Sequence, residues 1–260
     1  MGEVASPRST HSKQMTDTYT CVVTGASRGI GRGIAETLGD QGANVGVNYR
    51  SSEADAYEVV DAIEDAGGSA IPLQADVAED TAVEAMCDAV HDAFGPVDVL
   101  VNNAGITVDR TFENMTRANW ERVIDVNLGG VYNCTQAFYD DLREAKHGRL
   151  INISSVVGQE GNYGQANYAA TKSGLFGFTR TLALELASSG TTANCVAPGF
   201  VKTDMLCDVP DDVLEKILQR IPLDRFAEVD DVAGIVGFLA GKESAYMTGQ
   251  ILGVNGGMEW

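Results

Sequence analysis

The chain has 260 residues, of which 44% are hydrophobic, and its 37 acidic against 18 basic residues give a formal net charge of −19. This hydrophobic content supplies one full core, so we expect a single domain. Without a basic stripe to neutralise phosphates, and with an acidic surface that repels anionic lipid, the composition excludes nucleic acid and a membrane as partners.

Acidic residues are spread along the chain in short pairs such as Glu79-Asp80 and Asp140-Asp141. This spacing predicts a dispersed acidic surface rather than an acidic tail. At molar salt the Debye length falls to roughly 3 Å, which screens the self-repulsion of such a surface. We therefore expect a cytoplasmic protein of a salt-rich organism, with an ordinary acidic protein as the alternative.

The five cysteines show neither a CxxC pair nor another metal-ligand spacing, and they stand among apolar or small residues. We expect buried, reduced thiols and no metal site. Residues 1–17 are polar and lack an apolar run, which predicts a disordered N-terminal extension and neither a signal peptide nor an anchor. The domain is then expected over residues 18–260.

Along the rest of the chain, β-favouring runs alternate with helical segments. Strands are predicted at 20–24, 43–50, 70–74, 97–101, 149–153, 191–197 and 250–254. Helices are predicted at 32–38, 52–66, 79–94, 116–145, 168–189 and 228–241. Repeated βα units predict an α/β fold: a single-domain, Rossmann-type doubly wound parallel sheet flanked by helices. Residues 204–226 mix acids, prolines and one amphipathic piece, and are predicted to form a mobile substrate flap.

A glycine-rich turn follows the first predicted strand and opens the first helix. It reads Gly25-Ala26-Ser27-Arg28-Gly29-Ile30-Gly31, with the spacing TGxxxGxG. Glycines let the backbone approach a pyrophosphate, and the helix N-terminus offers donors and a partial positive charge. The turn therefore predicts a dinucleotide-binding corner, with a purely structural turn as the alternative.

The end of the second predicted strand indicates which dinucleotide binds. About 20 residues past the glycines, where an acid would hold the ribose of NAD, the chain has Asn48, Tyr49, Arg50 and Ser51. Arg50, together with Arg28 of the glycine turn, can flank a 2′-phosphate with planar guanidinium donors. These residues favour NADP over NAD, and a solvated strand-end charge is the alternative for Arg50.

The stretch from Ile151 to Lys172 carries the candidate chemistry. Ser154 and Ser155 follow a predicted strand, and Tyr168 and Lys172 stand four residues apart on one face of a predicted helix. A free tyrosine has a pKa of about 10, and a nearby ammonium stabilises the phenolate and lowers that pKa. Tyr168 is therefore a candidate general acid or base, and a loop serine with a polar helix face is the alternative.

Three further polar features stand in the chain. The small-residue turn Asn102-Asn103-Ala104-Gly105 follows the fourth predicted strand and can bring backbone close to a ligand. Asn127 is embedded in an apolar stripe of the helix at 116–145, where its buried amide serves either the core or the active site. His147, with Lys146 and Arg149 beside it, is expected in a surface loop.

Taken in order, these motifs resemble the short-chain dehydrogenase/reductase family, and the resemblance spans Thr20 to Gly257. The matching residues are Thr24 to Gly31, Asn102 to Gly105, Asn127, Ser155, Tyr168-Ala-Ala-Thr-Lys172 and Pro198-Gly199. The resemblance implies that Tyr168 protonates the carbonyl oxygen while the nicotinamide delivers hydride. It also implies that Ser155 binds the developing oxyanion. Lys172 would hold the nicotinamide ribose and lower the pKa of Tyr168, and Asn127 would position a relay water.

The family's cofactor and substrate contacts carry over position by position. The implied cofactor residues are Gly25, Ser27, Arg28, Gly29, Ile30, Gly31, Asn48, Arg50, Ser51, Asp76, Val77, Asn103, Ala104, Gly105, Tyr168, Lys172, Pro198, Gly199, Val201 and Thr203. The substrate-side candidates are Ser155, Asn162, Tyr163, Gln165 and Phe200. Members of the family are commonly tetramers, which implies a homotetramer packed through the helices at 116–145 and 168–189.

Within the family, the segment Gly158 to Asn167 looks most like that of 3-oxoacyl-thioester reductases. The resemblance implies reduction of such a thioester by NADPH, with two carriers open. Because acyl carrier protein is acidic and so is this chain, like-charge repulsion favours acetoacetyl-CoA, reduced to (R)-3-hydroxybutyryl-CoA for polyhydroxyalkanoate synthesis. A 3-oxoacyl-[acyl-carrier-protein] reductase of fatty-acid synthesis is the alternative, followed by a dehydrogenase acting on sugars or alcohols.

Two other classes of function fit parts of the sequence. The run Gly25 to Gly29 also matches the GxSxG nucleophile elbow of hydrolases, but that class needs a late histidine, and His91 and His147 stand in hydrophilic contexts. A dinucleotide-binding protein without activity would carry a damaged catalytic set, whereas the serine, tyrosine and lysine described above are all present. The sequence therefore favours an oxidoreductase.

Overall fold

The computed structural model describes residues 18–203 and 210–258. Three predictions therefore lie outside the described residues: the extension at 1–17, the first part of the flap at 204–209, and the thiol of Cys207. Within the described ranges, seven parallel strands form one sheet in the order β3-β2-β1-β4-β5-β6-β7. The predicted α/β doubly wound sheet is confirmed.

The strands are β1 Thr20–Val23, β2 Asn44–Tyr49, β3 Ser69–Gln74, β4 Val99–Asn102, β5 Arg149–Ile153, β6 Thr192–Pro198 and β7 Ile251–Val254. The α-helices are α1 Gly29–Asp40, α2 Glu53–Asp65, α3 Asp80–Phe94, α4 Arg117–Ile124, α5 Gly130–Ala137, α6 Tyr139–Glu144, α7 Val157–Glu160, α8 Ala166–Leu186, α10 Asp211–Leu218 and α11 Val229–Ala240. Shorter helical turns are η1 Phe112–Asn114, the π turn η2 Asp125–Gly129 and η3 Ala187–Ser189.

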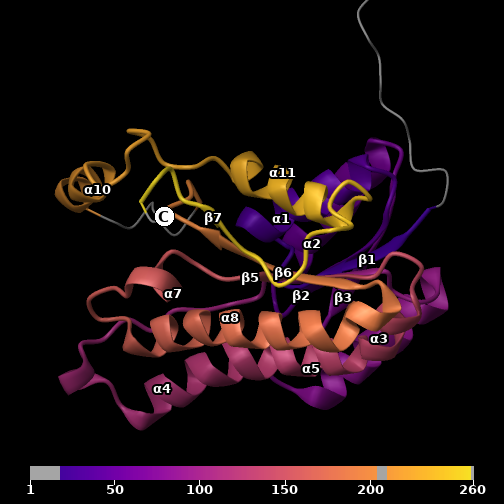
Figure 1. Cartoon of the computed structure of the whole chain (residues 1–260), viewed down its shortest axis with the longest axis horizontal. Coiled ribbons are helices and arrows are strands. Elements are labelled where there is room, and N and C mark those ends of the chain that lie inside the picture. The colour runs from indigo at the N-terminus through magenta and orange to yellow at the C-terminus, as the bar shows by residue number, and fades with distance from the viewer. Residues whose placement is uncertain (1–17, 204–209, 259–260) are drawn as a thin grey trace, which may run out of the picture.

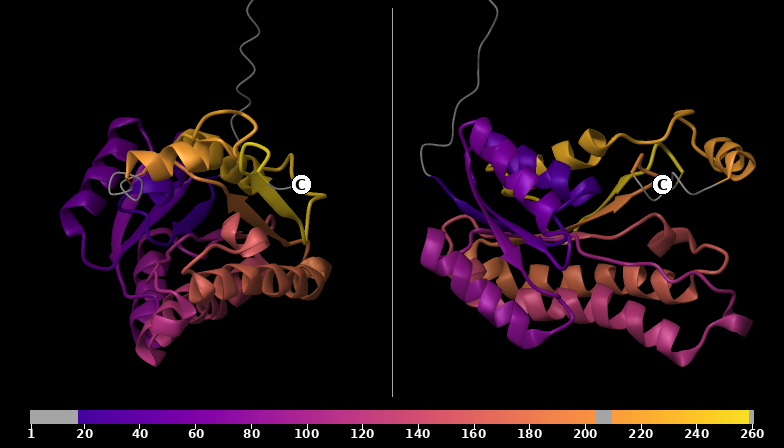
Figure 2. Two further views of the ribbon diagram at one scale, coloured as in Figure 1. Left: turned by 90° about the vertical axis from the view of Figure 1, so that its left-hand side faces the viewer. Right: turned by 180° about the vertical axis from the view of Figure 1, so that it is seen from behind.

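Helices cover both faces of the sheet. In Figure 1, α1, α2 and α11 pack on one face and α3, α5 and α8 on the other, and the two views of Figure 2 show the same three layers. Because βα crossovers bury a parallel sheet on both sides, its strands consist of nearly continuous apolar runs. Every residue of β1, β4, β5 and β6 is accordingly buried.

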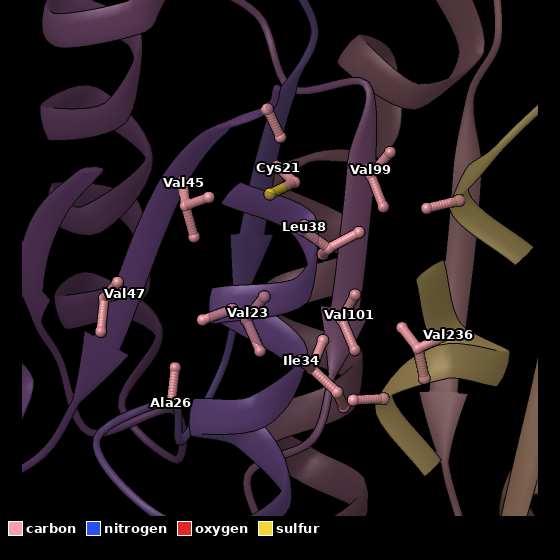
Figure 3. Packing of buried hydrophobic residues seen from close by; sticks show 14 of the residues in the cluster. Cys21, Val23, Ala26, Ile34, Leu38, Val45, Val47, Val99, Val101 and Val236 are labelled. Atoms are coloured by element: carbon pink, nitrogen blue, oxygen red, sulfur yellow. The ribbon is translucent and has the colours of Figure 1, made fainter. Parts of the chain in front are cut away.

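Alternate strand residues point to opposite faces of the sheet. Val23 of β1 pairs in register with Val101 of β4, and both belong with Ile34 of α1 to one buried cluster (Figure 3). The neighbouring pair, Val22 and Leu100, belongs to a second cluster with residues of α3, α5 and α6. Burying an aliphatic side chain of this size contributes about 1.5–3 kcal/mol. The two clusters hold the helical layers against the sheet.

The strand order reverses at the junction of β1 and β4, because the chain adds β2 and β3 on one side and then returns to β4 on the other. In open α/β sheets, ligands bind outside the carboxyl ends of the strands at such a point. The helices α7 and α10, which follow β5 and β6 in the chain, lie at one end of the molecule, on the left in Figure 1. The fold therefore positions a ligand crevice there.

Two predicted helices differ in detail from the structure. The predicted helix at 116–145 is divided into α4, α5 and α6, with the π turn Asp125–Gly129 inside it and a break at Phe138. The helix predicted at 168–189 is observed as α8, which begins two residues before the predicted start. The short helix α7 lies just before it, in a stretch where no helix is predicted. Apolar spacing indicates a helical face, but it does not reveal such local changes of backbone geometry.

Arg149 is the first residue of β5, as the strand predicted at 149–153 has it, and only 1% of its surface is exposed. Its Nη1 donates to the carbonyl oxygen of Gly148 at 2.9 Å, and its Nη2 donates to that of Gly241 at 3.1 Å. The segment at the C-terminal end of α11 therefore covers this side chain. His147 is exposed, as expected.

We predict that Gly31→Ala destabilises the fold, whereas Gly177→Ala stabilises it. A Cβ on Gly31 would lie 2.3 Å from the carbonyl oxygen of Gly25 and 2.4 Å from Asn103 Nδ2. Relieving such a clash costs about 1–3 kcal/mol. Gly177 lies within α8, where a Cβ would meet no atom of the described residues within 4 Å, so alanine gains about 0.5–1 kcal/mol there. Urea unfolding midpoints test both changes, and equal shifts would contradict the prediction.

Candidate active site

Four loops converge at the carboxyl edge of the sheet. They are the glycine turn at 25–29 after β1, residues 103–105 after β4, residues 154–155 after β5 and residues 199–203 after β6. Backbone hydrogen bonds hold the segment after β5 against the end of β6, because Ser154 N–H donates to the carbonyl oxygen of Val196 at 2.7 Å and Val156 N–H donates to that of Pro198 at 2.8 Å. These loops contain half of the predicted cofactor residues.

Side chains from neighbouring strands hold the glycine turn in place. Asn103 Nδ2 donates to the carbonyl oxygens of Thr24 at 2.9 Å and Gly25 at 3.1 Å. Asn48 Oδ1 accepts from the N–H of Gly25 at 3.1 Å. Gly25 and Gly29 have φ angles of +62° and +57°, in the left-handed region that favours glycine. The shape of the turn therefore depends on these glycines and on two asparagines.

The helix that follows the turn leaves its N-terminus open to an anion. Arg28 is the N-cap residue of α1, no side chain among the described residues caps the helix, and its first turn holds no acid. Uncapped N–H groups together with the helix dipole attract negative charge. The close approach at Gly31, where a Cβ would be excluded, keeps this backbone accessible. The turn fits the pyrophosphate of a dinucleotide.

Two arginines lie where the sequence predicts a 2′-phosphate. Arg28 is exposed in the glycine turn, and Arg50 follows directly after β2 with 52% of its side chain exposed. Arg50 Nη1 lies 3.9 Å from the carboxylate of Asp76, and the next residue, Ser51, is exposed. β2 ends in Tyr49 rather than in an acid. Both guanidiniums are therefore accessible to a phosphate group.

Asn48 differs from the role that the resemblance implies. It is 2% exposed, and its Nδ2 donates to the carbonyl oxygens of Leu73 at 3.1 Å and Ala75 at 3.2 Å while its Oδ1 holds Gly25. Both N–H groups of this amide and one lone pair of its oxygen are thus engaged within the protein. Asn48 would therefore affect a bound dinucleotide by holding the glycine turn in place. The side-chain N–H groups of Asn103 hold the same turn.

The remaining predicted cofactor residues flank the same loops. A Cβ on Gly29 would lie 3.5 Å from the methyl carbon of Thr203, so Thr203 lies next to the glycine turn. Val201 forms an isolated β-bridge with Ala227. Val201 is buried, as are Ser27, Val77 and Pro198, whereas Ile30, Ala104 and Gly199 are half-buried.

Tyr168 and Lys172 lie one turn apart at the start of α8, beside the end of β5. Lys172 is 4% exposed, and its Nζ donates to the carbonyl oxygen of Ile153 at 2.7 Å and lies 5.6 Å from the centroid of the Tyr168 ring. The side chain of Ser155 hydrogen-bonds with that of Tyr168 and also accepts from the N–H of Val157 at 3.1 Å. The structure thus brings the predicted serine, tyrosine and lysine together.

Burial dominates the ionisation of this trio. It raises the pKa of Tyr168 to about 12; the hydrogen bond from Ser155 opposes this rise and the carboxylate of Asp109 adds to it. Burial also lowers the pKa of Lys172 to about 8. The resemblance implies a lowered pKa for Tyr168, but in the protein alone the net shift is upward because desolvation of the phenolate outweighs the hydrogen bond. Tyr168 therefore stays protonated at neutral pH, as a general acid requires.

Asn127 is fully buried within the π turn. Its Oδ1 accepts from the N–H of Ile106 at 2.9 Å, and its Nδ2 donates to the carbonyl oxygen of Ile106 at 3.0 Å and to Thr171 Oγ1 at 3.2 Å. A Cβ on Gly105 would lie 3.4 Å from Asn127 Oδ1 and 3.5 Å from Lys172 Nζ, so the small glycine separates the amide from the ammonium. Asn127 thus serves the core and also lies near Lys172, and its role in the active site stays a prediction.

The loop that carries the substrate-side candidates Asn162, Tyr163 and Gln165 is held by a second loop, which contains Asp109 and which the sequence does not point to. Gln165 Nε2 donates to both carboxylate oxygens of Asp109, at 3.0 and 2.9 Å, and Asn162 Nδ2 donates to Gln165 Oε1 at 2.9 Å. We call Asp109, Asn162 and Gln165 the loop clamp. Tyr163, between the two amides, is 88% exposed, and Phe200 is half-buried in the loop after β6.

No pattern in the sequence marks Asp109 as a member of this clamp. It lies 56 residues before Gln165, in a stretch without regular strand or helix. A charged residue in such a stretch is ordinarily solvated, and only the fold brings the two loops into contact. The N–H of Arg110, which donates to the carbonyl oxygen of Gly164 at 2.8 Å, strengthens that contact.

The geometry excludes the hydrolase reading of Ser27. His91 lies on α3, where its Nε2 is 2.6 Å from the carboxylate of Asp141, and His147 precedes β5 at the amino edge of the sheet. Neither histidine of the described residues reaches the glycine turn at the carboxyl edge. The described chain contains no group of three His, Cys, Asp or Glu side chains arranged to hold a metal ion, and none of its helices is both long and apolar enough to cross a membrane.

The doubly wound sheet, the glycine turn and the Ser-Tyr-Lys trio define a nicotinamide-dependent oxidoreductase of the Rossmann type. Residues 25–259 match the family described as Enoyl-(Acyl carrier protein) reductase. The chain belongs to the short-chain dehydrogenase/reductase family, as the motifs predict, and is an oxidoreductase that acts on ketone and alcohol groups.

Three relatives have closely similar lengths. The chain is 49% identical over 237 residues to the 3-oxoacyl-[acyl-carrier-protein] reductase FabG of Staphylococcus epidermidis, which covers 91% of this chain and 97% of the relative. It is 49% identical over 244 residues to FabG of Staphylococcus aureus, covering 94% and 99%. It is 49% identical over 238 residues to the 3-oxoacyl-[acyl-carrier-protein] reductase of Synechocystis sp., covering 91% and 95%.

We predict that Gln165→Glu raises the KM for the thioester by about fivefold, roughly the effect of one lost hydrogen bond. The new carboxylate would face Asp109 and separate the two loops, while Tyr168 and the glycine turn stay in place. Gln250→Glu is the matched control, because the side chain of Gln250 is exposed and donates to the nearby carbonyl oxygen of Thr248. Steady-state kinetics measure both, and an unchanged KM with a lowered kcat would contradict a substrate-positioning role for the clamp.

Lys172→Met should stabilise the protein below pH 8 while abolishing turnover. The pKa of Lys172 is lower in the folded state, about 8, than its ordinary value of 10.5, so the folded state loses this proton first and gains stability relative to the unfolded state as pH rises from 8 to 10.5. The advantage of the methionine variant should therefore shrink over that window. Urea unfolding of both proteins at several pH values measures the difference. Lys216→Met, at a side chain with 72% exposure, is the matched control and should not stabilise the protein.

Proposed function

We propose that this protein is an NADPH-dependent 3-oxoacyl-thioester reductase that acts on substrates attached to acyl carrier protein. The observation that carries the proposal is the 49% identity, over more than nine-tenths of the chain, to reductases named for that substrate. Arg28, Arg50 and the lack of an acid at the end of β2 support NADPH as the cofactor.

The chemistry is the conversion of a ketone into a secondary alcohol. NADPH supplies the hydride when it is bound. The hydroxyl of Tyr168 holds the proton that passes to the carbonyl oxygen, and its high pKa keeps that proton in place until negative charge develops on the oxygen. Ser155, hydrogen-bonded to Tyr168, donates to the same oxygen and stabilises the developing charge.

Lys172 and Asn127 act around this pair. The buried ammonium of Lys172 lies beside the tyrosine ring and is positioned to bind the hydroxyls of a nicotinamide ribose. Asn127 Oδ1, which accepts one N–H in the structure, retains a second lone pair for a relay water. Asn162, Tyr163, Gln165 and Phe200 would contact the acyl chain or the pantetheine arm, held in position by the loop clamp.

The relatives favour the carrier protein over the CoA ester that the charge of the sequence favours. CoA remains the second candidate because the basic side chains of the flap are paired with acids. In the described part of the flap, residues 210–226, the pairs are Lys216 with Asp212 at 2.9 Å, Arg220 with Glu160 at 2.6 Å and Arg225 with Asp231 at 2.6 Å. Lys202 is likewise paired with Glu228. Paired cations offer an acidic carrier protein less attraction than unpaired ones would.

We also propose that four copies assemble through α5 and α8. Tyr132 on α5 and Leu184 on α8 are 57% and 81% exposed, and Tyr139, Phe178 and Leu182 line a surface hollow with Tyr132. Covering such side chains with a second copy would remove apolar surface from water. The net charge of −19 supports work in a salt-rich cytoplasm, where screening relieves repulsion between acidic subunits.

The decisive experiment compares NADPH oxidation with acetoacetyl-[acyl carrier protein], acetoacetyl-CoA and an enoyl-CoA, in dilute buffer and in about 3 M KCl, where the Debye length is shortest. We expect the highest kcat/KM with the carrier-protein substrate and no reduction of the enoyl thioester. Tyr168→Phe should abolish turnover and retain NADPH binding. Faster reduction of the CoA ester would establish the second candidate, and reduction of the enoyl thioester alone would refute both.

A further inference from the structure

The carboxylate of Asp76, just after β3, lies between two guanidinium groups. Arg50 Nη1, after β2, is 3.9 Å from Asp76 Oδ2, and Arg122 Nη2, on α4, is 3.8 Å from the same oxygen. The other oxygen, Oδ1, accepts the N–H of Ala78 at 3.1 Å, which fixes the orientation of the carboxylate. All three charged side chains are partly exposed. They therefore form one chain of charges at the surface, with the carboxylate in the middle.

Packing of the backbone, and not the ion pair alone, places Arg122 beside Asp76. A Cβ on Gly130, the first residue of α5, would lie 2.5 Å from the Cγ2 methyl of Val77, so α5 approaches the segment after β3 closely. Asn133 Nδ2 of the same helix donates to the carbonyl oxygen of Val77 at 3.0 Å. Helix α4 leads through the π turn into α5, and Figure 1 shows both helices in the same layer. Arg122 is thus held near the end of β3.

Asp76 lies close enough to Arg50 to oppose the binding of a phosphate. Arg50 is one of the two arginines accessible to a 2′-phosphate, and a carboxylate 3.9 Å away competes with that phosphate for the guanidinium donors. The negative charge of the carboxylate also repels the phosphate. Arg122 places a positive charge next to the same carboxylate oxygen. Arg50 can then turn to a phosphate without leaving Asp76 unpaired.

We propose that Arg122 strengthens the preference of this enzyme for NADPH over NADH, by pairing with Asp76 while Arg50 binds the 2′-phosphate. Arg122 is a positioning residue, because it acts through Asp76 and Arg50. The inference rests on NADPH as the cofactor of the proposed function. NADH carries a hydroxyl where NADPH carries the 2′-phosphate, so the binding of NADH should not depend on Arg122.

Equilibrium binding of NADPH and of NADH to the full chain, measured by titration calorimetry at low ionic strength, tests the proposal. Arg122→Gln should raise the Kd for NADPH about threefold, the effect of one exposed charge pair, and leave the Kd for NADH unchanged. The unchanged Kd for NADH would also show that the cofactor site is intact. Arg122→Lys keeps the charge and should bind NADPH nearly as tightly as the wild type.

Arg117→Gln is the matched control for this measurement. Arg117 lies on the same helix, its side chain is 82% exposed, and it pairs with Glu121 at 2.6 Å. Its loss changes the net charge by the same amount as Arg122→Gln, and it should alter neither Kd. An unchanged Kd for NADPH in Arg122→Gln, or an equal rise for both cofactors, would overturn the proposal.

A double-mutant cycle shows whether Arg122 acts through Asp76. Asp76→Asn removes the negative charge and keeps an acceptor for the N–H of Ala78. Whatever its own effect on the two Kd values, adding Arg122→Gln to it should leave their ratio unchanged, because no carboxylate remains to be offset. A threefold change of the ratio in both backgrounds would contradict the proposal.

The wild-type protein separates this inference from the proposed function. Tighter binding of NADH than of NADPH would refute NADPH as the cofactor and the inference with it. Tighter binding of NADPH, together with an unchanged ratio in Arg122→Gln, would refute the inference alone. In about 3 M KCl, where exposed charges are screened, the ratio in Arg122→Gln should approach that of the wild type.

Discussion

Lys172, buried between the end of β5 and the first turns of α8, is the residue whose position sets the geometry of the site. It joins the last residue of β5 to the first turns of α8, and the neighbouring Ser154 returns a hydrogen bond from its Oγ to the carbonyl oxygen of Lys172 at 2.8 Å. A Cβ on Gly158 would lie 2.8 Å from the carbonyl carbon of Lys172, so α7 also packs closely against this point. A charge removed from water needs such bonds, and making them fixes three elements relative to one another.

Much of this arrangement can be predicted from the chain, because it follows from local patterns. The alternation of apolar strands with helical segments is visible in one dimension, and it places residues 25–31 and 154–155 at the carboxyl ends of strands. The spacing of Tyr168 and Lys172 along one helix is equally local. These features depend on a few neighbouring residues, so the structure agrees with them closely.

The features that the sequence does not reveal depend on partners distant in the chain. The family resemblance implies a cofactor contact for Asn48, and only the fold shows that its amide also bonds to Gly25, Leu73 and Ala75. Arg149 begins a predicted strand, but nothing near it in the sequence predicts that its guanidinium donates to the carbonyl oxygen of Gly241 after α11. In each case the deciding contact lies more than 20 residues away, where periodicity carries no information about which groups meet.

The π turn Asp125–Gly129 couples two parts of the molecule that seem unrelated. A π turn contains one residue more than an α-helical turn, and one residue corresponds to a rotation of about 100° around a helix axis. Asn127 stands inside this insertion, and α5 continues from it. A relative that lacked the extra residue would turn both the amide and the exposed face of α5 away from their present directions. The rotation of α5 about its axis thus links the direction of the Asn127 amide to that of the outer surface that carries Tyr132. We expect that amide and that surface to change together in evolution.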